Sequence, residues 1–147
     1  MMGSVERCLG MDLGTKRIGL ALSDPLGWTA APIPALTRIG WKKDLAALRR
    51  LVETHAILRI VVGLPLRMDG EAGEQAKQAQ EFAARLQSAL GLPVETWDER
   101  LTTVQAERTL IESEVRREQR RQVIDSLAAS IILQGYLDYR NTAGASE

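Results

Sequence analysis

VERCLGMDLGTKRIGLALSD, residues 5–24, contains two apolar segments joined by a short polar turn. The first segment, Val5 to Met11, leads into Asp12 and predicts a buried strand. Residues 13–17 carry a glycine and two cations, which predicts a turn. The second segment, Ile18 to Leu22, predicts another strand. The chain therefore opens with a hairpin whose turn follows a carboxylate directly.

Beyond this hairpin, the pattern adds one strand and then alternates between helix and strand. Thr29–Leu36 completes a three-stranded meander, and Pro32 and Pro34 favour a sheet edge because proline donates no hydrogen bond. Two further strands are predicted, Ile57–Val62 and Val94–Trp97. Helices are predicted over Lys42–Thr54, Glu74–Leu90 and Arg120–Tyr139. A further helix is predicted to begin at the capping box formed by Thr102 and Gln105. This β-β-β-α-β-α-β-α-α order predicts an α/β fold with one mixed five-stranded sheet and helices on both faces.

Composition limits the possible classes of protein. The chain has 147 residues, 45% of them apolar and 26% charged, which is typical of one globular domain. We expect that domain to span residues 1–140, with 141–147 as a frayed tail. No segment is apolar enough to cross a membrane, and a single cysteine, Cys8, fits a reducing cytoplasm. The net charge is zero, so a polyanion site must be a local patch.

The segment Asp12-Leu-Gly14-Thr15-Lys16-Arg17 has three interpretations. It could be a solvated hairpin turn, or a functional carboxylate beside two cations. It also resembles the first phosphate loop of actin, the heat-shock ATPases and the sugar kinases. Those proteins clamp ATP between two such domains, so a chain of one domain argues against an ATPase and against a nucleotide cofactor. Gly10, Gly14 and Gly19 would let other groups approach the backbone closely.

Three carboxylates could meet at the edge of the sheet where the parallel strands end. Asp12 ends the first strand, and Glu99 follows the last one, while Asp125 lies in the final helix among small residues that would allow that helix close to the sheet. Ligand sites of such sheets form at the carboxyl ends of the strands. Two divalent cations, Mg²⁺ or Mn²⁺, held there by carboxylates could hydrolyse a phosphodiester bond. Each residue also has a structural interpretation, as a helix cap or as an ion-pair partner of Arg100 or Arg121.

The residues resemble the YqgF/RuvX family of small ribonuclease-H-like proteins, whose members are described as pre-16S rRNA processing nucleases and as Holliday junction resolvases. Four blocks in family order cover nearly the whole chain. They are Gly10–Gly19 with Ser23–Pro25, Val61–Pro65 with Met68–Gly70, Trp97–Thr103, and Ile124–Ala129 through Ile132–Gln134.

The resemblance implies a ribonuclease-H-like fold and roles for particular residues. Asp12, Glu99 and Asp125 would be the catalytic, metal-binding set, with Asp98 as a further ligand or a supporting neighbour. Lys16, Arg17 and Arg100 would contact the phosphate. Arg67 departs from the asparagine expected in the family's loop, and it adds a charge near the cleft.

Four arginines, Arg116, Arg117, Arg120 and Arg121, precede Asp125 within six residues. They are either a solvated helix start or a clamp for a nucleic-acid backbone. Trp97 could stack on a base, but core packing is the favoured interpretation.

Together these observations predict a cytoplasmic nuclease with two Mg²⁺ or Mn²⁺ ions, acting on structured RNA or on branched DNA. A resolvase must cut two opposed strands and favours a homodimer, whereas RNA trimming needs only a monomer. The exposed helix faces are polar, so no clear dimer helix is indicated. We therefore favour RNA as the substrate and the processing of the 5′ end of pre-16S rRNA as the function. The alternative from another class is a non-catalytic module that binds nucleic acid or the ribosome.

Overall fold

The computed structural model describes residues 7–65, 73–99 and 117–145, with side chains for all of these except 117–125 and 143–145. The elements are β1 (Arg7–Leu13), β2 (Arg17–Ser23), β3 (Ala30–Thr37), α1 (Trp41–His55), β4 (Ile57–Leu64), α2 (Glu74–Leu90), β5 (Val94–Asp98) and α4 (Arg117–Ala145). The helix predicted to open at Thr102 lies outside the described residues, as do Arg67, Arg100 and Arg116.

The strands form one mixed sheet in the order β3-β2-β1-β4-β5. Strand β1 is parallel to β4, and β4 to β5, whereas β2 is antiparallel to both of its neighbours. The predicted five-stranded mixed sheet is thus confirmed. Strand β3 lies at an edge, as Pro32 and Pro34 indicated, and the apolar strand β4 lies inside the sheet.

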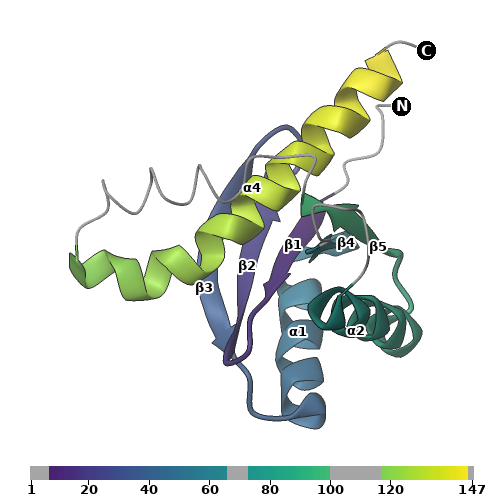
Figure 1. Cartoon of the computed structure of the whole chain (residues 1–147). Coiled ribbons are helices and arrows are strands. Elements are labelled where there is room, and N and C mark those ends of the chain that lie inside the picture. Colours follow the sequence, from purple (N-terminus) through teal and green to yellow (C-terminus); the bar gives the residue numbers. More distant parts are fainter. Residues whose placement is uncertain (1–6, 66–72, 100–116, 146–147) are drawn as a thin grey trace.

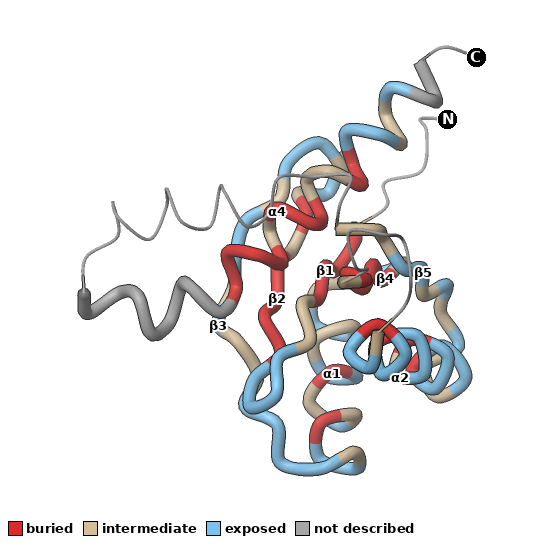
Figure 2. The backbone as a smooth tube through the Cα atoms, in the orientation of Figure 1, coloured by how far each residue is buried: buried red, intermediate tan, exposed pale blue. Residues whose placement is uncertain are grey.

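Helices cover both faces of the sheet (Figure 1). Helices α1 and α2 pack on one face over Leu9 and Met11 of β1, and α4 crosses the other face over Cys8. This division follows from the alternation of side chains along a strand. Figure 2 shows the result as buried segments along the central strands and the middle of α4. No helix in the described ranges is long and apolar enough to span a bilayer.

Glycines in the central strands bring α4 close to the sheet. A Cβ on Gly10 of β1 would lie 2.7 Å from Cβ of Leu133 and 3.0 Å from the carbonyl oxygen of Ala129. A Cβ on Gly63 of β4 would overlap the side chain of Ile132. Ala129 itself is fully buried. The close approach predicted from the small residues of this helix is therefore present, and the strands contribute to it as much as the helix does.

Helix α4 is longer than predicted. The sequence predicted a helix over 120–139 and a tail from 141, but the helix runs from Arg117 to Ala145. Its later turns are fixed to the loop between β2 and β3, where Asn141 Nδ2 donates to the carbonyl oxygen of Gly27 at 3.0 Å and Gln134 Nε2 donates to that of Trp28 at 2.9 Å. These tertiary hydrogen bonds extend a helix whose local sequence does not demand it.

Candidate active site

Asp12 lies near the carboxyl end of β1, on the face covered by α4. The strand ends two residues later than predicted, at Leu13, so Asp12 is inside it, opposite Gly19 of β2. Cys8 packs in the α4 cluster, and the missing side chain of Gly10 would point at Leu133. Because alternate residues share a face, Asp12 points to the α4 side as well.

Glu99 reaches the same face from the end of β5. Its Oε2 lies 3.3 Å from the position that a Cβ on Gly63 would occupy, and that position also abuts Ile132 of α4. Strand β4 runs between β1 and β5, and Met11 is in register with Val62, so Gly63 is the next residue of β4 beside Asp12. Neighbouring strands are about 4.8 Å apart. Two carboxylates thus flank a strand position that has no side chain.

Asp98, the residue before Glu99, belongs to the opposite face. It is in register with Leu64, which packs in the cluster under α1 and α2. Trp97 is in register with Gly63, whose missing side chain would point at α4. The sequence could not separate the two adjacent acids, because the separation depends on the pairing of β5 with β4.

Asp125 is brought to this end of the sheet by the backbone of α4; its side chain is outside the described set. The next residue, Ser126, is fully buried, and its hydroxyl accepts a hydrogen bond from the N–H of Leu20 at 3.2 Å and donates to the carbonyl oxygen of Ile33. Leu20 is opposite Met11, the residue before Asp12. In the sequence, the small size of Ser126 indicates only that the helix can approach the sheet closely, and no local pattern indicates this anchor.

The chemical type of the site residues suits a hard divalent cation. Two carboxylates approach from different strands on one face, and oxygen donors are the ligands that Mg²⁺ and Mn²⁺ prefer. No group of three metal-ligating side chains occurs among those the structure describes. The third ligand predicted from the sequence, Asp125, falls outside that set.

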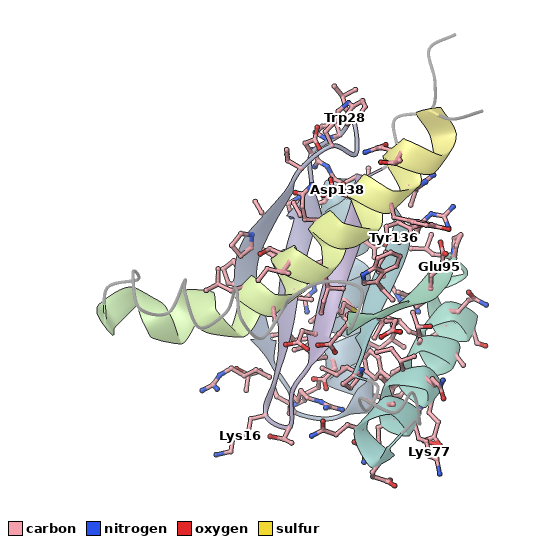
Figure 3. All side chains as sticks on the ribbon, turned by 45° about the horizontal axis from the view of Figure 1, so that its top comes forward. Lys16, Trp28, Lys77, Glu95, Tyr136 and Asp138 are labelled. Atoms are coloured by element: carbon pink, nitrogen blue, oxygen red, sulfur yellow. The ribbon has the colours of Figure 1, made fainter. Side chains whose placement is uncertain are left out.

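The turn after Asp12 presents the cations Lys16 and Arg17 at the surface, and Lys16 marks its tip in Figure 3. Gly14 N–H donates to the carbonyl oxygen of Arg17 at 2.9 Å. Arg38, which follows β3, braces the turn: its Nη1 donates to the carbonyl oxygen of Gly14 at 2.7 Å, and its backbone N–H donates to that of Lys16 at 2.9 Å. No local pattern in the sequence indicates this role of Arg38, because its contacts are with a distant segment.

Behind the carboxylates, aromatic contacts join β5 to α4. Trp97 meets Tyr136 edge-to-face, with ring centroids 5.8 Å apart. The Tyr136 hydroxyl donates to Oε2 of Glu95 at 2.8 Å, and Glu95 also pairs with Arg59 (Figure 3 labels Tyr136 and Glu95). Burial and the neighbouring Glu95 carboxylate raise the pKa of Tyr136 to about 12. The preferred interpretation of Trp97 as a packing residue agrees with these contacts.

The other arginines predicted to bind nucleic acid are placed only in part. Arg117, Arg120 and Arg121 lie in the first turns of α4, but their side chains are outside the described set. The clamp interpretation therefore stays a prediction.

Comparison with known proteins identifies relatives along nearly the whole chain. The family model described as "RuvX: Holliday junction resolvase" matches residues 6–139. A protein of Moorella thermoacetica is 54% identical over 132 residues, which are 90% of this chain and 94% of that protein. A protein of Myxococcus xanthus is 52% identical over 132 residues, which are 90% of this chain and 87% of that protein. Both carry the name "Putative pre-16S rRNA nuclease".

Solved structures share the architecture at low sequence identity. The RuvC protein of Thermus thermophilus in complex with a Holliday junction substrate superposes with a TM-score of 0.56 at 14% identity, covering 93% of this chain and 96% of that one. The Holliday junction resolvase of fowlpox virus gives a TM-score of 0.53 at 12% identity, covering 90% and 99%. These likenesses confirm the ribonuclease-H-like fold. The family match and the identity to full-length relatives, taken with this fold, show that the chain belongs to the RuvX family.

Proposed function

We propose that this protein is a metal-dependent nuclease that hydrolyses phosphodiester bonds during processing of the 5′ end of pre-16S rRNA. The observation that carries the proposal is the pair Asp12 and Glu99 on the α4 face, separated by the side-chain-free Gly63. The names of the full-length relatives at 52–54% identity support the RNA substrate.

In this proposal, Asp12, Glu99 and Asp125 would hold two divalent cations, Mg²⁺ or Mn²⁺. Asp98 is left out of the set, because it is in register with Leu64 on the opposite face of the sheet. When bound, such cations activate a water molecule and neutralise the charge that develops on the phosphate. Asp12 and Glu99 come from the carboxyl ends of β1 and β5, which both pair in parallel with β4, and this pairing fixes their spacing before substrate arrives. The hydrogen bonds of Ser126 to Leu20 and Ile33 hold the helix that supplies the third.

Lys16 and Arg17 orient the substrate phosphate from the turn that follows Asp12, and Arg100 assists from beyond β5. Arg38 keeps the turn in its shape through the hydrogen bond to Gly14. The arginines at 116, 117, 120 and 121 bind flanking phosphates, and Arg67 adds a further positive charge. Electrostatic attraction of this kind makes binding weaken steeply with salt.

A second candidate is cleavage of Holliday junctions. It is favoured by the description of the family model, "RuvX: Holliday junction resolvase". A resolvase must cut two opposed strands, so this activity requires a symmetric pair of active sites and hence a homodimer. A non-catalytic nucleic-acid or ribosome-binding module is the alternative from another class.

Cleavage of two substrates side by side tests the proposal. A labelled pre-16S rRNA fragment with its 5′ extension and a labelled four-way DNA junction are incubated with the protein and Mg²⁺ or Mn²⁺, and the mass of the protein in solution is measured in the same buffer. We expect cleavage of the RNA by a monomer. Symmetric cleavage of the junction by a dimer would replace the first proposal with the second, and binding without any cleavage would support the module.

A further inference from the structure

A groove lies beside the β1–β2 turn, on the face of the sheet that carries α1 and α2. It consists of two adjoining depressions of about 300 and 530 Å³. Five residues line both of them: Thr15, Arg38, Gln78, Phe82 and Arg85. We call this the Arg38–Arg85 groove. Leu13 and Gly14 line its first part, so the groove begins directly after Asp12 in the chain.

Both arginines of the groove are oriented by aromatic rings. The guanidinium carbon of Arg85 lies 4.1 Å from the ring centroid of Trp41, and that of Arg38 lies 6.0 Å from the ring centroid of Phe82. The two rings meet edge-to-face, with centroids 5.8 Å apart. Stacking of this kind fixes a guanidinium while leaving its N–H groups at the edge available.

The hydrogen-bonding capacity of these arginines is mostly unused by the described part of the chain. Arg38 donates there from its side chain to the carbonyl oxygen of Gly14, and Arg85 makes neither a hydrogen bond nor an ion pair within the described ranges. Asp44 lines the second depression, but its carboxylate accepts hydrogen bonds from the N–H groups of Ile39 and Gly40. Among the described residues that line the first depression, Glu81 is the one acid, and its charge would repel an anion.

Neutral donors complete the lining. Thr15 supplies a hydroxyl, while Gln75 and Gln78 supply amides from the first turns of α2. Lys16 and Lys77, the sequence neighbours of Thr15 and Gln78, lie at the same end of the molecule (Figure 3). Oriented guanidinium groups, amides and a hydroxyl are the donor set that recognises phosphate oxygens.

We propose that the Arg38–Arg85 groove binds the phosphodiester backbone of a single-stranded segment that adjoins the scissile position. The inference rests on the proposed function, since it assumes that nucleic acid occupies the carboxylate site. The groove and that site lie on opposite faces of the sheet and meet at the β1–β2 turn. A duplex is too wide and stiff to bend around one turn, whereas a single strand can follow it and track a positive groove.

Binding of matched oligonucleotides tests the groove. The probes are a labelled RNA duplex with a single-stranded arm of about eight nucleotides, enough to fill one such groove, and the same duplex without the arm. Fluorescence anisotropy is measured in EDTA so that no cleavage occurs. The variants are Arg85→Gln, Arg38→Gln and Glu81→Gln. The control is Arg50→Gln, because Arg50 is exposed on α1 and lines neither depression.

We expect each groove arginine variant to bind the armed probe about fivefold more weakly and the blunt probe equally well. The slope of log affinity against log salt for the armed probe should become shallower by about 0.7 for each phosphate that the variant no longer neutralises. Glu81→Gln should bind the armed probe more tightly, which a purely structural role of the cluster does not predict. Arg50→Gln should match the wild type.

Arg85→Gln is the decisive variant, because Arg38 also braces the β1–β2 turn. The melting temperatures of all variants show whether each one keeps the fold. Equal affinity of wild type, Arg85→Gln and Glu81→Gln for the armed probe would overturn the groove and leave the proposed function standing. If the wild-type protein bound neither probe, the proposed function and the groove would fail together.

Discussion

Glu99 Oε2 lies 3.3 Å from the place where a Cβ on Gly63 would stand. This relationship joins the last strand to the centre of the sheet and sets the carboxylate of Glu99 on the same face as Asp12. Gly63 therefore keeps open the space into which the two acids converge. A glycine inside a strand weakens the strand, so its presence here points to a close approach that a side chain would block.

Gly63→Ala should lower the rate of cleavage, while its effect on the free energy of unfolding should be small. The added methyl group would meet the flexible end of Ile132, which can move, and the carboxylate of Glu99, whose position matters for chemistry. Gly10→Ala is the matched control, because its methyl group would meet Cβ of Leu133 and the backbone of Ala129, which cannot move. We expect a loss of about 1–3 kcal/mol for Gly10→Ala and less for Gly63→Ala.

Chemical denaturation and cleavage rates measured below both melting temperatures separate these effects. Full activity in Gly63→Ala, with reduced activity in Gly10→Ala, would reverse the expected order. In that case Gly63 would serve only the packing of α4.

Divalent cations should stabilise the protein through Asp12. Carboxylates that converge in one cleft repel each other, and a bound cation removes that repulsion. At a metal concentration about tenfold above Kd the gain is about 1.4 kcal/mol, or a rise in melting temperature of ~3–6 °C. Thermal melts with and without Mg²⁺ or Mn²⁺ measure it. Asp12→Asn should abolish the rise, and an undiminished rise in that variant would place the metal elsewhere.

Ser126→Ala should destabilise the protein by about 1–3 kcal/mol, because it leaves the buried N–H of Leu20 and the carbonyl oxygen of Ile33 without their partner. Leu20 and Ile33 are register partners next to an irregularity in the β2–β3 pairing, and the serine bridges them there. Ser130→Ala is the control, since Ser130 donates only within the helix, to Leu127. Equal stability of the two variants in urea titrations would show that α4 is not anchored by this serine.

More of the fold than of the candidate site could be predicted from the sequence. Apolar runs and turn residues define the meander and the βαβ order, because those patterns are local. The division of Asp98 from Glu99 depends on the register of β5 against β4, and the bracing of the turn by Arg38 depends on contacts between distant segments. Such relationships exist only after folding, so no local pattern indicates them.

The C-terminal end of α4 also depends on contacts between distant segments. The residues from 141 look like a tail in the sequence, since no apolar stripe continues there. In the structure, Asn141 donates a hydrogen bond to Gly27 in the loop between β2 and β3, and the helix continues to Ala145. The position at which this helix ends is therefore set by tertiary hydrogen bonds and not by helix propensity.

Stability should fall between about pH 10 and pH 12 through Tyr136. Its pKa is raised from 10.0 to about 12 in the folded protein, so in this range the unfolded chain loses the proton and the folded one keeps it. The stabilisation is complete below about pH 10 and disappears as the pH rises past about 12. Urea titrations at about pH 9 and about pH 11, on either side of the unfolded pKa, should show a smaller decrease in Tyr136→Phe than in the wild type. Tyr139→Phe, an exposed position, should decrease as the wild type does; equal decreases in all three would contradict the assignment.

A pair of neighbouring substitutions tests whether Glu99 and Asp12 form one metal-dependent site on the α4 face. Glu99→Gln and Asp98→Asn each remove one carboxylate charge, one residue apart and on opposite faces of the sheet. Cleavage of labelled pre-16S rRNA with Mg²⁺ or Mn²⁺ is compared in the two variants at equal melting temperature. We predict that Glu99→Gln loses cleavage by at least about a hundredfold, as a lost catalytic group does, and that Asp98→Asn keeps most of it. Loss of cleavage in Asp98→Asn with activity retained in Glu99→Gln would show that the active site is not formed by Glu99 and Asp12 on the α4 face.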